Sequence, residues 1–166
     1  MENKNNEQLY LFHQGTYYCA YEYLGAHPFE ENGKTGYIFR TWAPNASKIN
    51  VVGDFNLWDN TKNPMKKISE GGVWEAKIYG AKQFDKYKFE IFDKNNYARL
   101  KADPYAFMNE TNGKTASIVY DIEGYKWNDK GYIEYRNSKN NYESPMNIYE
   151  LNFASWKKQS DCSYYT

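Results

Sequence analysis

The sequence has few of the residues from which metal sites and disulfide frameworks are made. Its 166 residues include two cysteines and two histidines. Neither His13 nor His27 has a Cys, Asp or His neighbour at the spacing of metal ligands, so we expect no metal site and no cofactor. Cys19 and Cys162 lie near opposite ends of the chain, which favours free thiols in a cytoplasmic setting over the alternative of one bridge.

A net charge and long apolar runs are missing as well. Lys and Arg number 21, as do Asp and Glu, so no basic field is present to hold the phosphates of a nucleic acid. No apolar run approaches the roughly 18 residues of a membrane span. The opening residues, MENKNNEQ, contain no apolar segment of a secretory signal. We expect a cytoplasmic monomer whose partner is neither nucleic acid nor membrane.

Catalytic patterns are absent too: we find no carboxylate pair suited to acid–base chemistry, no glycine-rich phosphate loop and no Ser/His/Asp arrangement. Asp54, Asp93, Asp103 and Asp121 each fall beside a turn or a proline. Aspartate at such positions commonly accepts backbone N–H bonds. We therefore assign these four residues structural roles and predict no catalytic residue.

Aromatic residues are abundant, at 19% of the chain, and their alternation with polar residues predicts an all-β fold. Strands are expected at 36–43, 47–53, 73–79, 84–92, 97–101 and 115–121. The clearest is 84–92, where Tyr87, Phe89 and Ile91 should face one side. Trp42 and Trp74 alternate with charged residues and are predicted to lie in the core. Residues 30–34 read as a hairpin loop, because Asn-Gly supplies a positive-φ turn.

The flanks of this β-rich region have a different composition. Residues 1–8 are polar and aperiodic, which predicts disorder, and residues 9–30 are expected to form a short helical segment that stops near Gly25. Residues 31–124 would form the β domain. Residues 125–144, rich in Asn, Lys and Tyr, are expected to be a linker with one short helix, and 145–166 a separate segment with a short strand at 148–151.

Seven blocks of this sequence together resemble bacterial glycogen (1,4-α-glucan) branching enzymes. The most informative is GYIFRTWAPNASKINVVGDFNLWD at 36–59. The others, in chain order, are LFHQGTYYCAYEYLGAHP (11–28), NPMKKI (63–68), GVWEAKI (72–78), KYKFEI (86–91), RLKADPYAF (99–107) and PMNIYELNFASW (145–156). Their common order over most of the chain makes a chance similarity implausible.

The resemblance implies an immunoglobulin-like β-sandwich, a family-48 carbohydrate-binding module, at 31–124. It further implies that 145–166 begin the (β/α)8 barrel of a family-13 glycoside hydrolase. Such enzymes make α-1,6 branches in glycogen biosynthesis by cleaving and transferring α-1,4-glucan chains. No position here matches their nucleophile or acid/base, so the fragment should bind α-glucan, glycogen or maltooligosaccharides but be inactive alone. Its other partner would be the barrel of the same chain, against which Trp127 and Trp156 would pack.

Trp58 is the first candidate for sugar contact. It follows a strand at what should be a sheet rim, where a flat ring can stack on the apolar face of a sugar, with the amide of Asn56 nearby. In a related module, the glycogen-binding domain of the AMP-activated protein kinase β subunit, a tryptophan in the same turn stacks on glucose. Packing of Trp58 against the connection at 61–67 is the alternative.

The same module suggests further contacts. Tyr97 stands near its second stacking tryptophan, Lys88 matches a lysine that binds sugar hydroxyls, and Thr115 matches a threonine. Ser117 stands where the module has a sugar-binding asparagine, a departure for which Asn112 could compensate. Ordinary exposed strand residues are the alternative for Tyr97 and Lys88.

Two other functions remain open at this stage. The domain could serve mainly to pack on and stabilise the catalytic barrel, with little glucan affinity of its own. It could also be the equivalent domain of a related debranching or trehalose-forming enzyme, although the LGAHP, NVVGDFNLWD and DPYAF blocks favour a branching enzyme.

Overall fold

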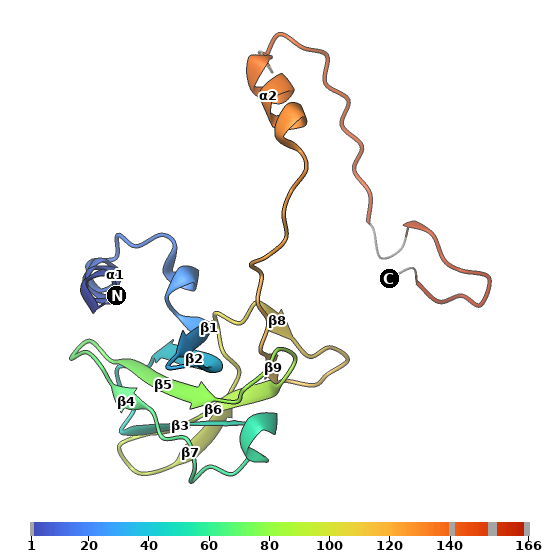
Figure 1. Ribbon diagram of the computed structural model, residues 1–166. Helices are drawn as coiled ribbons and strands as arrows, with labels where there is room; N and C mark the ends of the chain where they lie inside the picture. The colour runs from blue at the N-terminus through green and yellow to red at the C-terminus, as the bar shows by residue number, and fades with distance from the viewer. Residues whose placement is uncertain (1, 140–141, 153–155, 165–166) are drawn as a thin grey trace. The chain divides into compact units, whose positions relative to one another are not determined.

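The computed structural model describes residues 2–139, 142–152 and 156–164 (Figure 1). It separates into two compact units, Met1–Tyr125 and Lys126–Thr166. The first unit contains all the named strands, and its sheets enclose the core. The division falls next to residue 124, where the sequence predicts the end of the β domain.

The first sheet has the order β1-β2-β5-β4. Its strands are β1 (Gly25–Glu31), β2 (Lys34–Trp42), β5 (Val73–Tyr79) and the short β4 (Lys66–Lys67). All three pairings are antiparallel. The β1–β2 hairpin turns at Asn32 and Gly33, both with positive φ, as the Asn-Gly pattern predicts.

The second sheet has the order β3-β6-β9-β8, and β7 also pairs with β6. Its strands are β3 (Lys48–Gly53), β6 (Lys86–Phe92), β7 (Ala98–Lys101), β8 (Met108–Asn109) and β9 (Ser117–Ile118). The strand predicted at 115–121 is therefore much shorter than expected, and β4 and β8 were not predicted. Two-residue strands are too short for any alternation to be visible in the sequence.

The core lies between the two sheets and is rich in aromatic rings. Phe39 of β2 packs edge-on against Tyr87 of β6, with ring centroids 4.9 Å apart, and Phe89 is also fully buried. Trp74 is buried, and its indole N–H donates to the Ala43 carbonyl at 3.1 Å. These burials confirm the inward faces predicted for 84–92 and for Trp74. Burial of rings on this scale dominates the stability of a small domain.

The prediction that Trp42 lies in the core is wrong. Its side chain is 53% exposed, and its indole N–H donates to the Gly71 carbonyl at 2.8 Å. Both alternating sets of β2 contain apolar residues, and the set with Phe39 and Thr41 takes the inner face. Trp42 therefore lies on the outer face, where Phe12 packs edge-on against it.

The N-terminal segment differs from both predictions made for it. A helix, α1, spans Glu2–Gln14 where residues 1–8 were expected to be disordered, and η1 covers Ala20–Glu22. Residues from Gly25 onward form β1 instead of a helical segment. Pro28 conceals this strand in the sequence, but β1 is at the edge of its sheet, where proline is tolerated.

This segment covers the outer face of β2. Tyr23 and Leu24 are buried with Val73 in a second, smaller cluster. Helix α1 lies beside the β4–β5 turn, where His13 Nε2 is 3.0 Å from Ser69 Oγ. Consequently β2 is buried on both faces over much of its length.

The second unit has little regular structure. Helix α2 spans Lys130–Ser138, in agreement with the one short helix expected in the linker. The strand predicted at 148–151 does not form. A strand needs a neighbouring strand to supply its hydrogen bonds, and none of the named strands lies in the described part of this unit. Residues 153–155 of the predicted barrel start lie outside the described residues. No helix in the described part of the chain is long and apolar enough to cross a membrane.

Candidate functional site

The loop after β3 holds two apolar side chains in a strained conformation. After η2 (Asp54–Asn56), Leu57 and Trp58 have φ of 58° and 62°. Left-handed backbone at a residue other than glycine costs on the order of 1–3 kcal/mol and tends to persist at functional sites. Leu57 is nevertheless 84% exposed and Trp58 40% exposed, so the fold keeps an apolar pair at the surface at a cost in stability.

Asp54 fixes the orientation of the indole ring. The Trp58 indole N–H donates to Asp54 Oδ1 at 3.0 Å, and the Lys86 backbone N–H donates to Asp54 Oδ2 at 2.9 Å. The exposed ring is thereby tied to the first residue of β6. A ring held in this way loses little further freedom when a ligand covers it.

Lys88 lies opposite Val52, next to the end of β3 that leads into this turn, and Thr115 is hydrogen-bonded to it. Lys88 faces outward on the same side of β6 as Lys86, two residues away and therefore roughly 7 Å along the strand. Its ammonium donates to Thr115 Oγ1 at 2.6 Å. We call the surface formed by Trp58, Lys88 and Thr115 the tryptophan face.

Asn112 belongs to the neighbouring β8–β9 hairpin. It takes φ of 57° in the turn that joins these strands. The hairpin is linked to β6 by an ion pair of 3.2 Å between Lys86 Nζ and Glu110 Oε1. Asn112 thus lies in the same exposed loop as Thr115, and a sugar contact for it stays a prediction.

Asn56 has to be removed from the predicted contact set. Its side chain is only 5% exposed, and its Oδ1 accepts the Gly53 N–H at 3.0 Å. Its Nδ2 donates to the Val51 carbonyl at 2.9 Å and to Asn63 Oδ1 at 2.7 Å. Because these bonds engage both ends of the amide, Asn56 holds the loop closed and does not present the amide to a ligand.

Ser117 is also directed away from the surface. It lies opposite Tyr87 in the sheet register and is fully buried. Its Oγ accepts the Asp103 N–H and is 2.9 Å from Asn109 Oδ1. It therefore cannot take the place of a sugar-binding asparagine.

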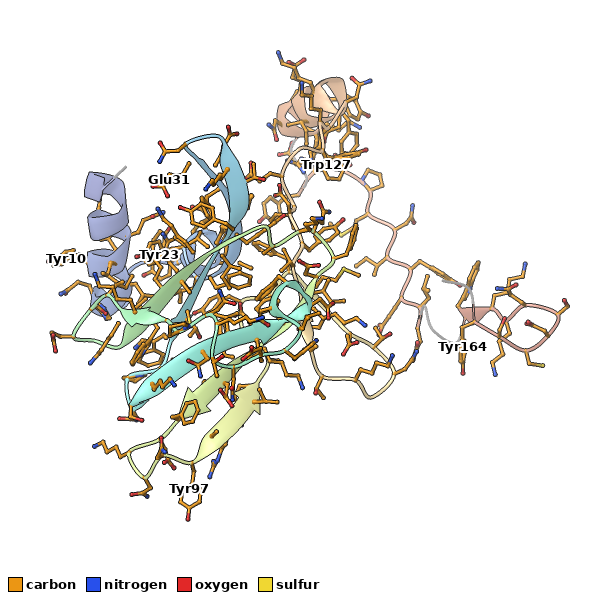
Figure 2. All side chains as sticks on the ribbon, turned by 60° about the horizontal axis from the view of Figure 1, so that its bottom comes forward. Tyr10, Tyr23, Glu31, Tyr97, Trp127 and Tyr164 are labelled. Carbon is orange, nitrogen blue, oxygen red and sulfur yellow. The ribbon has the colours of Figure 1, made fainter. Side chains whose placement is uncertain are left out.

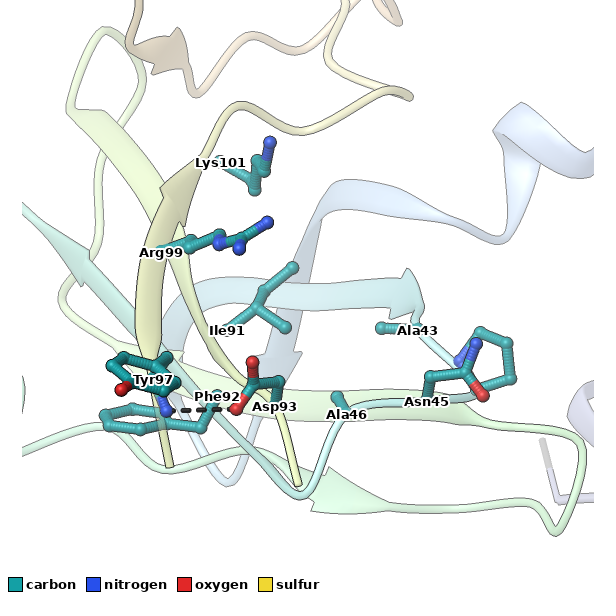
Figure 3. Close-up of a pocket in the computed structure, with 10 residues that line it drawn as sticks. Ala43, Asn45, Ala46, Ile91, Phe92, Asp93, Tyr97, Arg99 and Lys101 are labelled. Carbon is teal, nitrogen blue, oxygen red and sulfur yellow. Dashed lines mark hydrogen bonds between the residues drawn. The ribbon is translucent and has the colours of Figure 1, made fainter. Parts of the chain in front are cut away.

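Tyr97 lies at the other end of β6 (Figure 2). Its carbonyl accepts the Asp93 N–H across the β6–β7 hairpin, whereas Trp58 is tied to Lys86. Seven residues of strand separate these two ends of β6, or roughly 20 Å. Tyr97 is 69% exposed and lines a separate groove beside the hairpin (Figure 3). The structure therefore divides the predicted sugar contacts between two places.

A polar bridge occupies the sheet surface between these two ends. The Glu90 carboxylate accepts from Asn50 Nδ2 and from Asn60 Nδ2, both at 2.9 Å. Asp59, which follows Trp58 in the sequence, accepts from the Thr61 hydroxyl at 2.7 Å, which lowers the pKa of its carboxyl. These side chains can bind hydroxyl groups but already bond to one another, except at Asn50 Oδ1, a buried oxygen with no hydrogen-bond partner among the described residues.

The turn carboxylates behave as the sequence predicts. Asp93 accepts the N–H groups of Asn95 and Tyr97, and Asp121 accepts that of Glu123. Within the described residues, no group of three or more His, Cys, Asp or Glu side chains could hold a metal ion.

A comparison with protein-family models matches residues 23–106 to carbohydrate-binding module 48 (isoamylase N-terminal domain). The chain belongs to this family. Its sequence is 50% identical over 157 residues to the 1,4-α-glucan branching enzyme GlgB of Halothermothrix orenii and 44% identical over 158 residues to that of Bacillus subtilis. Each match covers 95% of this chain and 25% of the relative, so the chain spans about a quarter of their length.

Among solved structures, the family-48 module is similar to part of a pullulanase from Anoxybacillus sp. LM18-11 complexed with maltotetraose. The identity is 27% and the TM-score 0.47, over 60% of this chain and 14% of the pullulanase.

Sequence reasoning on the family-48 module missed Asp54 and Leu57 as parts of the surface. Asp54 was assigned to a turn, which is correct for its Oδ2 but leaves out the bond from its Oδ1 to the indole. The separation of four residues between Asp54 and Trp58 was the available signal. Leu57 gave none, because an apolar residue beside tryptophan suggests packing, whereas the structure leaves its side chain exposed.

Replacing Leu57 with glycine should stabilise the module by about 1 kcal/mol, because glycine adopts φ of 58° without the Cβ strain. Urea denaturation would measure the change, and Leu100→Gly, at an exposed strand position, is the matched control that should be destabilised. Equal losses of stability in both variants would contradict the strain at Leu57.

Proposed function

We propose that the tryptophan face binds α-1,4-linked glucan and that the chain is the N-terminal glucan-binding domain of a branching enzyme. The observation that supports this proposal most directly is the exposed indole of Trp58, which Asp54 holds in a strained turn. Membership of a carbohydrate-binding family and the names of the relatives support the sugar and the enzyme class.

The groups on the tryptophan face suit a neutral, hydroxyl-rich ligand. One side of a pyranose is apolar and can cover the indole, because its axial C–H bonds point there. Lys88 has three N–H donors and gives one to Thr115, so two can reach sugar hydroxyls. Thr115 accepts from Lys88 through oxygen, which leaves its own O–H able to donate.

In the complete enzyme this domain would hold a long glucan near the catalytic barrel. Tethering raises the effective concentration of a chain, so a weak contact is sufficient. The described residues include no catalytic group, and the transfer reaction belongs to the rest of the enzyme. The same proposal makes the two sheets of the first unit, which begin with β1 at Gly25 and not at residue 31, an immunoglobulin-like sandwich. It makes 125–144 a linker and 145–166 the start of the barrel. It also places the protein in the cytoplasm as a monomer.

Calorimetric titration with maltoheptaose tests the proposal. Trp58→Ala should weaken binding at least about tenfold, because central tryptophans commonly contribute about 2 kcal/mol or more to an interface. Trp127→Ala removes a 75% exposed indole from the second unit and should leave the affinity unchanged.

Lys88→Met should produce a smaller loss of affinity in the same titration. It removes the N–H donors that can reach sugar hydroxyls but keeps an aliphatic side chain of similar length. Saturable binding that neither Trp58→Ala nor Lys88→Met alters would place the glucan elsewhere and refute the assignment.

A further inference from the structure

A groove of about 330 Å³ lies beside the β6–β7 hairpin, on the opposite side of β7 from Leu100. Ala43, Ala46 and Ile91 supply apolar lining, while Arg99 and Lys101 line it from β7. In Figure 3 both basic side chains extend toward the side on which Ile91 and Ala43 lie.

The sheet register explains why two cations are found here. Arg99 lies opposite Ile91 and Lys101 opposite Phe89, so both occupy positions on the inner, core-side face of the sheet. Both are nevertheless exposed, so the other sheet does not cover this part of β7. The groove is the open continuation of the core, with basic residues where apolar ones would otherwise lie.

No counter-ion for these cations is found in the part of the chain that the structure describes. Among the described residues, neither Arg99 nor Lys101 makes a side-chain hydrogen bond or an ion pair. The carboxylate in the groove lining, Asp93, already accepts two backbone N–H groups, from Asn95 at 2.8 Å and Tyr97 at 3.0 Å. The groove therefore contains two cations and one carboxylate that is already hydrogen-bonded to the backbone, which leaves a net positive charge.

We propose that this groove binds a sugar phosphomonoester. The guanidinium of Arg99 can bind phosphate oxygens in a bidentate manner and Lys101 adds a second charge. Ala43, Ala46 and Ile91 offer an apolar surface to the C–H side of the ring, and the exposed amide of Asn45, also in the lining, can bind hydroxyls. A volume near 330 Å³ is at the lower end for small-molecule sites, which suits one sugar unit.

This groove is independent of the tryptophan face. The groove is on the inner face of the sheet, opposite to the face that carries Lys88, and its lining residue Lys101, paired with Phe89, is roughly 10 Å along the strand from Lys86. Its ligand is anionic, whereas the tryptophan face suits a neutral glucan. Failure of one site therefore leaves the other untouched.

Inward-pointing charges also protect exposed strand edges against pairing with other chains. That role alone would make Arg99→Gln/Lys101→Gln more prone to aggregation and would require no ligand. The decisive readout is therefore ligand affinity, with aggregation followed separately by light scattering.

The experiment is calorimetric titration of the chain with glucose 6-phosphate, inorganic phosphate and glucose. Saturable binding of glucose 6-phosphate should weaken at least about tenfold in Arg99→Gln and again in Arg99→Gln/Lys101→Gln, and should weaken with added salt. Lys66→Gln, on exposed β4 in the other sheet, makes the same charge change as one groove variant and should have no effect. Trp58→Ala should likewise leave this affinity unchanged.

Backbone amide shifts in the unmodified chain provide a second readout that needs no variant. Glucose 6-phosphate should shift the signals of residues 43–46 and 97–101. Absence of saturable binding, shifts elsewhere, or affinity unchanged in Arg99→Gln/Lys101→Gln would overturn the proposal. Affinity for inorganic phosphate equal to that for glucose 6-phosphate would show that the sugar ring is not recognised and would overturn that part of the proposal.

Titration with a phosphorylated maltooligosaccharide distinguishes two sources of the ligand. Tighter binding than that of glucose 6-phosphate would indicate a phosphate ester on glucan. Equal or weaker binding would indicate a free hexose phosphate.

Discussion

Replacing Glu75 with glutamine should destabilise the first unit by about 3 kcal/mol. Its carboxylate pairs with Arg40, whose Nε donates to Glu75 Oε2 at 2.8 Å, and Arg40 is only 7% exposed. The guanidinium also lies 4.3 Å from the centroid of the Tyr23 ring. Removing one partner of a buried pair leaves an uncompensated charge, which typically costs 3–5 kcal/mol; the partial exposure of Glu75 favours the lower end.

Two comparisons separate this effect from a general loss of charge. Arg40→Met/Glu75→Met, which removes both charges, should recover most of the lost stability. Glu31→Gln, at the exposed Lys77–Glu31 pair, should change stability little. Urea unfolding measures all three variants, and similar losses for Glu75→Gln and Glu31→Gln would show that burial of Arg40 does not matter.

The free energy of unfolding should fall by up to about 2 kcal/mol as the pH rises from 4.5 to 7. Burial raises the pKa of Asp103 from 3.8 to about 6 in the folded chain. The protonated form is therefore favoured by folding, and its stabilisation is lost between roughly pH 4 and pH 6. Hydrogen bonds from the Tyr87 hydroxyl and the Tyr105 N–H favour the ionised form and limit the size of the effect.

Exposed carboxyl groups impose the opposite trend at lower pH. Hydrogen bonds from Tyr79 and Lys77 lower the pKa of Glu31, and those from Thr61 lower the pKa of Asp59. Their contributions to stability disappear as the pH falls below about 4.5, since a lowered pKa favours the folded state only where the unfolded group is ionised. The interval from about pH 4.5 to pH 6.5 therefore isolates Asp103.

Asp103→Asn tests the assignment, because asparagine keeps an acceptor for Tyr105 N–H and a polar group for the Tyr87 hydroxyl. The variant should be more stable than the parent chain at pH 7 and should lose the pH dependence between 5 and 7. Unfolding by urea at these two pH values gives the comparison. A parent chain that is more stable at pH 7 than at pH 5 would contradict the raised pKa of Asp103.

The sequence predicts those strands whose two faces differ clearly in polarity. Phe89 is fully buried and Lys88 lies on the opposite face, as the alternation in 84–92 indicates. Where both alternating sets contain apolar residues, as around Trp42, the sequence does not show which set faces inward. Strand β1 was missed because it contains Pro28, and its position at the edge of the sheet, where proline is tolerated, is a tertiary feature.

The candidate site was predictable only in part. The turn that follows a strand and the family resemblance were enough to single out Trp58 and Lys88. The burial of Asn56 depends on how the loop closes around it, which its neighbours in the sequence do not reveal. Arg99 resembled any edge-strand cation, because its position on the inner face depends on the pairing of β7 with β6.

The central claim is that glucan occupies the tryptophan face, and mapping backbone amide shifts during a maltoheptaose titration tests it most directly. Saturable shifts are expected in residues 54–60 and 86–88 and at Thr115, with little change at residues 97–101. Shifts confined to the hairpin at Tyr97 or to residues 126–164, or none at millimolar sugar, would contradict it.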